Sequence, residues 1–277
     1  MTLSEPRAWL WTRWITSRAC HFFCEANHLY PKIASVLAEL DIESPLSLEE
    51  ASKSLTHLVL EAPLPPELDT AIQNAFARVF GDDLPPKTCA MRSSAVGEDG
   101  LFSFAGQFRT VLNVGPEGLA EAYKQVIASK YSAGALLYRV RGGFLDQETP
   151  MAVLALEMLD AAASGIVYSQ SPLSSQPSSI VVYSVWGLGE LLVKGAATPD
   201  RIEIARHGES LQVIRKEKAS GESKMVLARS GLVETVALDP FEREHLSLSE
   251  SMALQLAAWS VLLERRFGGP QDVEWCL

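Results

Sequence analysis

The sequence predicts an α+β fold in which a mostly helical N-terminal part precedes a region of interspersed strands and helices. Two observations predict this class. Residues 1–80 carry apolar side chains at three- and four-residue spacing, which is typical of amphipathic helices. After residue 85, short β-like runs lie between polar, glycine-containing loops, without the regular strand–helix repeat of a doubly wound sheet.

The composition is that of a chain that buries a substantial core, with 47% hydrophobic and 21% charged residues. Because 24 Lys and Arg stand against 34 Asp and Glu, the net charge of −10 disfavours general nucleic-acid binding. The best candidate for a membrane span, residues 151–168, is interrupted by Glu157 and Asp160. The N-terminus carries Glu5 and Arg7 and does not resemble a signal peptide. We therefore expect a cytoplasmic protein without nucleic-acid or membrane partners.

Helices are expected in the N-terminal part within residues 3–27 and over residues 30–40, 47–60 and 67–80. Ser47, followed three residues later by Glu50, has the spacing of a capping box. Prolines interrupt the pattern at 62–66, and a Gly-Asp-Asp sequence with two prolines interrupts it again at 81–86. The second break predicts a boundary between a helical subdomain, residues 1–84, and a body, residues 85–277.

Strands are expected in the body at residues 88–92, 109–114, 152–158, 165–169, 180–185, 201–205, 211–216, 232–237 and 272–275, and helices at 117–130, 133–140 and 240–267. The long last helix has clear end signals. Asp239 is the expected N-cap, Pro240 the first helical residue and Glu242 the third, and Gly268 follows the end.

Near the N-terminus, Cys20, Cys24 and His28 would share one face of a helix, and that face could hold a metal ion. Structural zinc sites usually use a Cys-x-x-Cys turn, which is absent there. We favour the interpretation that the two cysteines are buried core residues. Zinc binding is the alternative.

Three segments carry residues suited to phosphate and metal chemistry. Arg92, followed by two serines at a predicted strand end, can present several donors to a phosphate, although a local ion pair is the alternative. Small residues at 103–107 allow a backbone to approach an anion closely, or simply form a tight turn. Asp272 and Glu274 alternate along a strand and so face one side. This arrangement suits a Mg²⁺ ion whose coordination shell is completed by phosphate oxygens. The alternative is two acidic residues on an exposed strand face.

Taken together and in this order, these segments resemble the nucleotide-binding domain of the phosphoenolpyruvate synthase and pyruvate phosphate dikinase family, which has an ATP-grasp fold. The matching elements are Arg92-Ser93-Ser94, Glu98-Asp99, 103–107, 110–114, Tyr138-Arg139, Ser164-Gly165, 186–190, Pro199-Asp200 and 268–275. The resemblance covers about residues 85–277. It implies an ATP-grasp-like α+β fold with ATP and Mg²⁺ as cofactors. It also implies that a histidine on a separate swivelling domain of the same longer chain is phosphorylated, for transfer to pyruvate.

The resemblance also implies roles for individual residues. Arg92 corresponds to the family's phosphate-contacting arginine, expected to be catalytic, and Gly106 and Thr110 to the loop over the phosphates. Glu157 stands where the family usually has a glutamine at the adenine segment. Glu274 corresponds to the Mg²⁺-binding carboxylate, with Asp272 beside it.

The chain departs from the family pattern at both ends. It contains no Gly-Gly-Lys segment, and no Leu-Gln-x-Arg segment follows residues 272–275. We therefore expect an ATP-grasp body that is incomplete at both ends and binds Mg-ATP weakly. Two alternatives stay open: the ATP module of a related phosphotransferase with an antibiotic or glucan acceptor, and a non-catalytic domain that binds a nucleotide or a partner.

Overall fold

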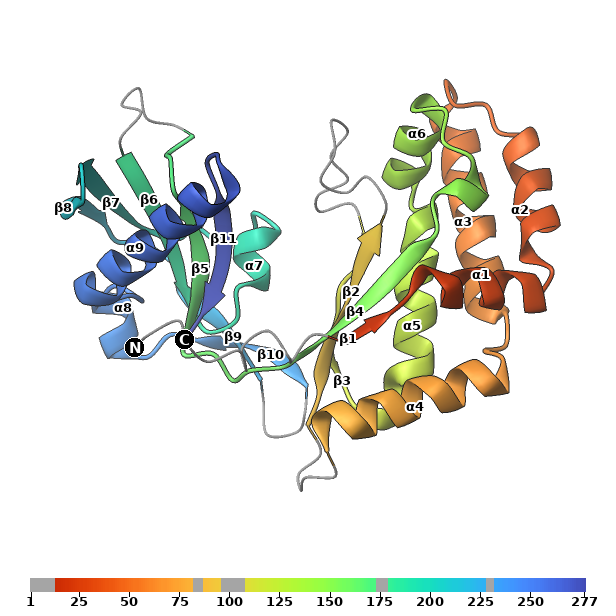
Figure 1. Ribbon diagram of the computed structural model, residues 1–277, viewed down its shortest axis with the longest axis horizontal. Helices are drawn as coiled ribbons and strands as arrows, with labels where there is room; N and C mark the ends of the chain where they lie inside the picture. Colours follow the sequence, from red (N-terminus) through yellow and green to blue (C-terminus); the bar gives the residue numbers. More distant parts are fainter. Residues whose placement is uncertain (1–12, 82–86, 96–107, 173–178, 228–231) are drawn as a thin grey trace. The chain divides into compact units, whose positions relative to one another are not determined.

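The computed structural model describes residues 13–81, 87–95, 108–172, 179–227 and 232–277, and Figure 1 labels its elements. The chain forms two compact units, Met1–Met158 (unit 1) and Leu159–Leu277 (unit 2), each with its own hydrophobic core. Helices occur together with antiparallel sheets, so the predicted α+β class is confirmed. The boundary predicted at residue 84/85 lies inside unit 1, where helices give way to strands, and as a domain boundary it stays a prediction.

The first part of unit 1 is mainly helical, as the sequence periodicity predicts. Its helices are α1 (Ser17–Ala26), α2 (Leu29–Ala38), α3 (Pro45–Glu61) and α4 (Pro66–Phe80). The buried residues of α3, among them Leu48, Leu55 and Val59, recur at three- and four-residue spacing along one face. Proline begins both α3 and α4, because its fixed φ suits the first helical position and its missing N–H costs nothing there.

Two local predictions in this region are wrong. Arg13–Ile15, expected to be helical, form strand β1, which pairs with β4 (Met151–Glu157). Helix α3 begins before the expected capping box: Ser44 is its N-cap, and the Ser44 hydroxyl accepts a hydrogen bond from the Ser47 backbone N–H at 3.3 Å. Because Pro45 is the first helical residue, the helix starts closer to the N-terminus than predicted, and Ser47 lies inside its first turn.

The strands of unit 1 form an antiparallel sheet in the order β1-β4-β2-β3, with β2 at Cys89–Ala95 and β3 at Val111–Val114. The remaining helices of this unit are α5 (Leu119–Ala128), α6 (Ala133–Arg141) and the short 3-10 helices η2 (Pro116–Gly118), η3 (Ser129–Tyr131) and η4 (Asp146–Glu148). Helix α5 packs on β2, β3 and β4, and α1 packs on β4. Met91 and Val153 are fully buried in the resulting core, so one sheet face is covered by helices.

Unit 2 is built on a second antiparallel sheet, in the order β11-β5-β6-β7-β8. Its strands are β5 (Ala163–Tyr168), β6 (Ser179–Trp186), β7 (Asp200–His207), β8 (Ser210–Glu217) and β11 (Asp272–Cys276). Helix α9 (Glu250–Phe267) packs on one face, where Ile180, Val182 and Ile202 are fully buried. The other elements are α7 (Glu190–Val193), α8 (Pro240–Glu244) and a hairpin of β9 (Ser223–Leu227) and β10 (Val233–Ala237). The sequence did not predict β9.

The helix predicted over residues 240–267 is two helices, α8 and α9. The predicted N-cap at Asp239 and the predicted end at Gly268 are both confirmed, and the structure adds that Glu242 completes a capping box with Asp239. The break between them follows from Asp200, whose buried carboxylate accepts hydrogen bonds from the Ser247 N–H and hydroxyl, both at 2.7 Å. Ser249 then caps α9. The Pro199-Asp200 segment therefore has a structural role in holding this turn.

The cysteine pair of α1 lies in the core of unit 1, where Cys20 and Cys24 are each 2% exposed, whereas His28 is exposed. The part of the chain that the structure describes has no group of three or more metal-ligating side chains. This placement favours the interpretation of the cysteines as core residues. None of the described helices is long and apolar enough to cross a membrane.

Candidate functional site

Strand register determines which face of the unit 1 sheet Arg92 occupies. Met91 is fully buried against the helices, so the next residue, Arg92, points to the opposite face. Arg92 lies directly opposite Leu154 on β4, and Leu156 follows on the same face by alternation. Both leucines are half-buried. This face combines a guanidinium with apolar surface, which suits a ligand with phosphates and a flat base.

Glu157 occupies the other face of the same sheet. It lies opposite Cys89, which is fully buried in the helix-covered core. Its carboxylate forms an ion pair with Lys87, with Nζ and Oε1 3.1 Å apart. The structure therefore does not bring the Glu157 and Arg92 side chains together.

Thr110 lies next to the Arg92 strand in the fold. It directly precedes β3, whose Val111 pairs with Met91 on β2. The Thr110 side chain is half-buried. Gly106, with the whole of segment 103–107, lies outside the described residues, as do Glu98 and Asp99.

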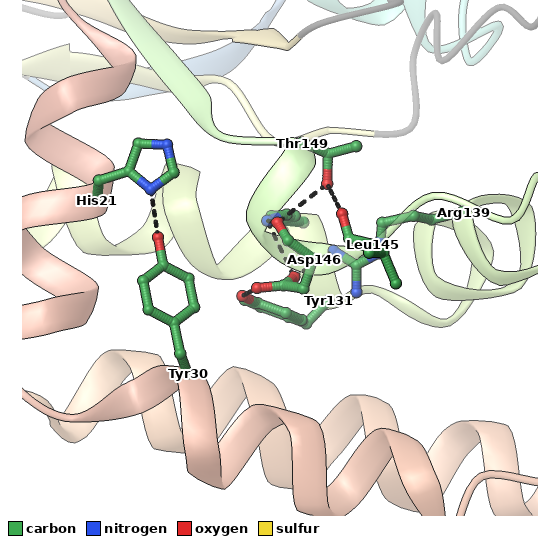
Figure 2. A network of polar contacts seen from close by, with 8 residues as sticks. His21, Tyr30, Tyr131, Arg139, Leu145, Asp146 and Thr149 are labelled. Carbon is green, nitrogen blue, oxygen red and sulfur yellow. Dashed lines mark hydrogen bonds and ion pairs between the residues drawn. The ribbon is translucent and has the colours of Figure 1, made fainter.

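A buried ion cluster gives the Tyr138-Arg139 segment a structural role (Figure 2). Lys130 Nζ lies 2.9 Å and Arg139 Nη1 lies 2.7 Å from the same Asp146 oxygen, Oδ1. The Tyr131 hydroxyl donates to the other oxygen at 3.2 Å. Burial lowers the pKa of Lys130, against the opposing attraction of Asp146. This cluster joins α6 to the loop before β4, and so positions the strand that faces Arg92.

In unit 2, Asp272 and Glu274 point away from helix α9. Val273 and Trp275, the residues between and after them, pack against the α9 core. Because side chains alternate along a strand, both carboxylates lie on the sheet face opposite α9, and both are exposed. Asp272 lies opposite Tyr168 on β5, and Glu274 lies opposite Ile166. The predicted shared face is therefore present.

Tyrosines adjoin these carboxylates on the same face. The rings of Tyr168 and Tyr183 meet edge to face, with centroids 6.1 Å apart. Burial raises the pKa of Tyr168 above its ordinary value, and the charges of Asp272 and Glu274 raise it further. Arg201, opposite Tyr183 on β7, is held by Glu203 at 2.9 Å and Glu217 at 3.2 Å. The face therefore carries a row of charged and aromatic side chains.

Two glycines of the matched segments are required by close packing. A Cβ on Gly165 would lie 2.0 Å from the Tyr183 carbonyl oxygen and 2.5 Å from the Trp275 ring. Gly187 has φ +73° and pairs with Met225, whose carbonyl oxygen would lie 2.1 Å from a Cβ. These glycines of the predicted motifs therefore allow strands to approach closely.

The donor set of Asp272 and Glu274 fits Mg²⁺. This cation prefers oxygen ligands and is usually held by one or two carboxylates together with substrate phosphates. Asp272 and Glu274 provide two exposed carboxylates on one strand face, as this coordination requires. The two residues would hold the ion, and the remaining ligands would come from the nucleotide and water.

Sequence reasoning missed the residues that share faces with the predicted ones. Leu154 and Leu156 share the Arg92 face, and Tyr168 and Tyr183 share the carboxylate face. The two-residue alternation within each predicted strand was the available signal. Which strands are neighbours, and hence which residues lie opposite one another, was not visible in that pattern.

Comparison with known proteins shows the family of this chain. The model of the family described as "Pyruvate phosphate dikinase, AMP/ATP-binding domain" matches residues 9–277. The chain belongs to this family. The resemblance drawn from short motifs, and with it the ATP-grasp-like fold class, is thus confirmed. The match begins at residue 9, so it extends beyond the predicted range of 85–277 into the helical part.

Named relatives agree with this assignment. Phosphoenolpyruvate synthase of Deinococcus radiodurans is 35% identical over 267 residues, covering 94% of this chain and 34% of that protein. The synthase of Escherichia coli is 31% identical over 275 residues, with the same coverage of 94% and 34%. Rifampicin phosphotransferase of Bacillus cereus is 30% identical over 253 residues, covering 91% of this chain and 28% of that protein. The chain spans about a third of the length of these relatives.

Proposed function

We propose that the chain binds Mg-ATP as the nucleotide-binding part of a longer dikinase, which phosphorylates a histidine on a separate swivelling domain and releases AMP. Of the two phosphoryl groups that ATP loses in this reaction, one is transferred to the histidine and the other passes to water and leaves as inorganic phosphate. From that histidine the phosphoryl group passes to pyruvate. The family match over residues 9–277 carries this proposal. The outward placement of Arg92 in unit 1, and of two carboxylates in unit 2, supports it.

In unit 1, the Arg92 guanidinium binds phosphate oxygens through paired hydrogen bonds. Gly106 and Thr110 contribute close backbone and hydroxyl contacts to the same phosphates. Glu157 belongs to the adenine segment. Because its carboxylate is already paired with Lys87, we expect its side chain to contribute little to affinity.

In unit 2, Glu274 and Asp272 hold Mg²⁺. The bound ion would neutralise phosphate charge during transfer. The chain's own residues act by positioning and by electrostatic stabilisation, because phosphoryl transfer requires little covalent work from the protein.

The choice of phosphate acceptor depends on other domains. The relative named rifampicin phosphotransferase favours one alternative, an antibiotic acceptor, and a glucan acceptor is a further one. The third candidate is a non-catalytic domain that binds a nucleotide or a protein partner.

Calorimetric titration of the chain with Mg-ATP tests the binding step. Arg92→Ala and Glu274→Ala are expected to weaken binding at least tenfold. The matched controls are Arg78→Ala and Glu222→Ala, which remove exposed charges from each unit. Unchanged affinity in both test variants, with binding by the parent chain, would contradict the residue assignment.

The transfer step is tested on the complete gene product with ATP that is radiolabelled in both its β- and γ-phosphates, because AMP retains the α-phosphate. A phosphohistidine gives a label that acid removes and alkali retains, and that label is the expected result. A complete protein that binds Mg-ATP but acquires no such label would instead support the non-catalytic alternative.

A further inference from the structure

A cavity of about 390 Å³ lies among the helices of unit 1. Its described lining residues are Ser52, Thr56, Leu60, Phe108, Arg109, Gln125, Ala128, Ser129, Ser132 and Ala133. Its volume lies in the lower part of the range of small-molecule sites, roughly 300–1,000 Å³. None of these residues belongs to β2 or β4, so the cavity is separate from the strand face of Arg92.

Helix α3 supplies one wall of the cavity. Ser52, Thr56 and Leu60 recur every four residues and so form a single stripe along the helix. The neighbouring stripe, with Leu55 and Val59, is fully buried in the core. Among the described residues, the Ser52 and Thr56 hydroxyls have no hydrogen-bond partner, so both are available to a ligand.

The end of α5 and the start of α6 supply the second wall. The Ser132 hydroxyl caps α6 by accepting from the Ala135 N–H at 3.3 Å, so its own proton is free to be donated. The Ser129 hydroxyl donates to the Val126 carbonyl at 2.6 Å, so its oxygen can still accept. The Gln125 amide nitrogen donates to Glu121 at 3.4 Å, which leaves the amide oxygen available.

Arg109 gives the cavity a positive charge. Within the described part of the chain, its guanidinium has no hydrogen-bond or ion-pair partner, and the cavity lining contains no carboxylate. Lys124 lies close to the same wall, because its ammonium donates to the Leu60 carbonyl at 2.6 Å. A guanidinium with several hydroxyl donors is the combination that recognises carboxylate and phosphate groups.

We propose that this cavity binds a small organic anion, a carboxylate or phosphate ester that also carries hydroxyl groups. Arg109 pairs with the anionic group. Ser52, Thr56 and Ser132 donate to its oxygens, and Gln125 and Ser129 accept from its hydroxyls. This site goes beyond the proposed nucleotide function, because none of its residues is assigned to ATP or Mg²⁺.

The test uses 3-phosphoglycerate as the probe, since it carries a carboxylate, a hydroxyl and a phosphate. The chain is titrated while amide chemical shifts are followed by NMR, and uncharged glycerol is titrated in parallel. The expected result is saturable shifts at the cavity residues with 3-phosphoglycerate and none with glycerol. Absence of saturable shifts, or shifts that cluster around Arg92 and Leu154 instead, would overturn the proposal.

Three variants sharpen the test. Arg109→Gln is expected to weaken probe binding at least tenfold, whereas Arg78→Gln, an exposed arginine of α4, leaves it unchanged. Arg92→Ala, which is expected to lose Mg-ATP, keeps the same affinity for the probe. Failure of the nucleotide assignment and failure of the cavity proposal are therefore distinguishable. Undiminished probe binding by Arg109→Gln contradicts the cavity proposal.

Discussion

An ion cluster of unit 1 and a pair of carboxylates of unit 2 differ in their exposure to solvent. Unit 1 buries a cluster in which Lys130 and Arg139 are 5% and 3% exposed and share the carboxylate of Asp146. Unit 2 keeps Asp272 and Glu274 exposed on the sheet face opposite α9. A buried ion pair has to be satisfied by the protein itself, whereas an exposed carboxylate can exchange water for a metal ion. We infer that the buried charges maintain structure and the exposed ones serve binding.

The largest expected effect comes from breaking the buried cluster. Asp146→Asn removes the charge that both cations share, so they remain buried without a counter-ion. We expect unfolding to become easier by about 3–5 kcal/mol, the usual effect of breaking a buried pair. Denaturant unfolding measures it, with Glu148→Gln, an exposed carboxylate of η4, as the control. A loss below about 1 kcal/mol, as for an exposed ion pair, would remove the contrast between the units.

A smaller effect is expected in the packing of the unit 2 sheet. Gly165→Ala would place a methyl group 2.0 Å from the Tyr183 carbonyl and 2.5 Å from the Trp275 ring. Overpacking of this kind typically costs about 1–3 kcal/mol. Because Trp275 lies between the carboxylates and α9, its fluorescence should also change. Gly221→Ala, where no atom lies within 4 Å, is the matched control. Equal stability of the two variants would show that the strand contact is not rigid.

Helix ends could be predicted from the sequence, whereas the break between two helices and the facing of strand residues could not. Local signals identified the Asp239 cap and the Gly268 terminus, because those depend on neighbours in the chain. The break between α8 and α9 was not predicted, because it depends on the hydrogen bond from Ser247 to Asp200, which lies 47 residues away in the sequence. The opposite faces of Arg92 and Glu157 escaped for a related reason: strand partners and register depend on tertiary packing.

The smallest expected effect is a pH dependence in unit 2. Burial alone would raise the pKa of Glu264, but hydrogen bonds from Arg206 and Ser169 and the nearby positive charges outweigh it and lower the pKa. The folded state therefore favours the ionised carboxylate. This stabilisation is present above the unfolded-state pKa near 4.5, and is lost as pH falls through the lower folded-state pKa.

Unfolding free energies of the parent chain and Glu264→Gln, compared between neutral and acidic pH, measure this effect. At neutral pH we expect the parent to be more stable by about 1 kcal/mol or less, because the pair is partly exposed. The difference should shrink as pH falls below about 4.5. A difference that grows on acidification would have the wrong sign for a lowered pKa.

The measurement that tests the contrast most directly is Mn²⁺ binding followed by electron paramagnetic resonance, with Mn²⁺ replacing Mg²⁺. With ATP present, the parent chain should bind the ion. The double variant Asp272→Asn, Glu274→Gln should lose at least tenfold in affinity, while Glu222→Gln binds like the parent. If the double variant binds Mn²⁺ and ATP as the parent does, the exposed face of unit 2 is not the metal site.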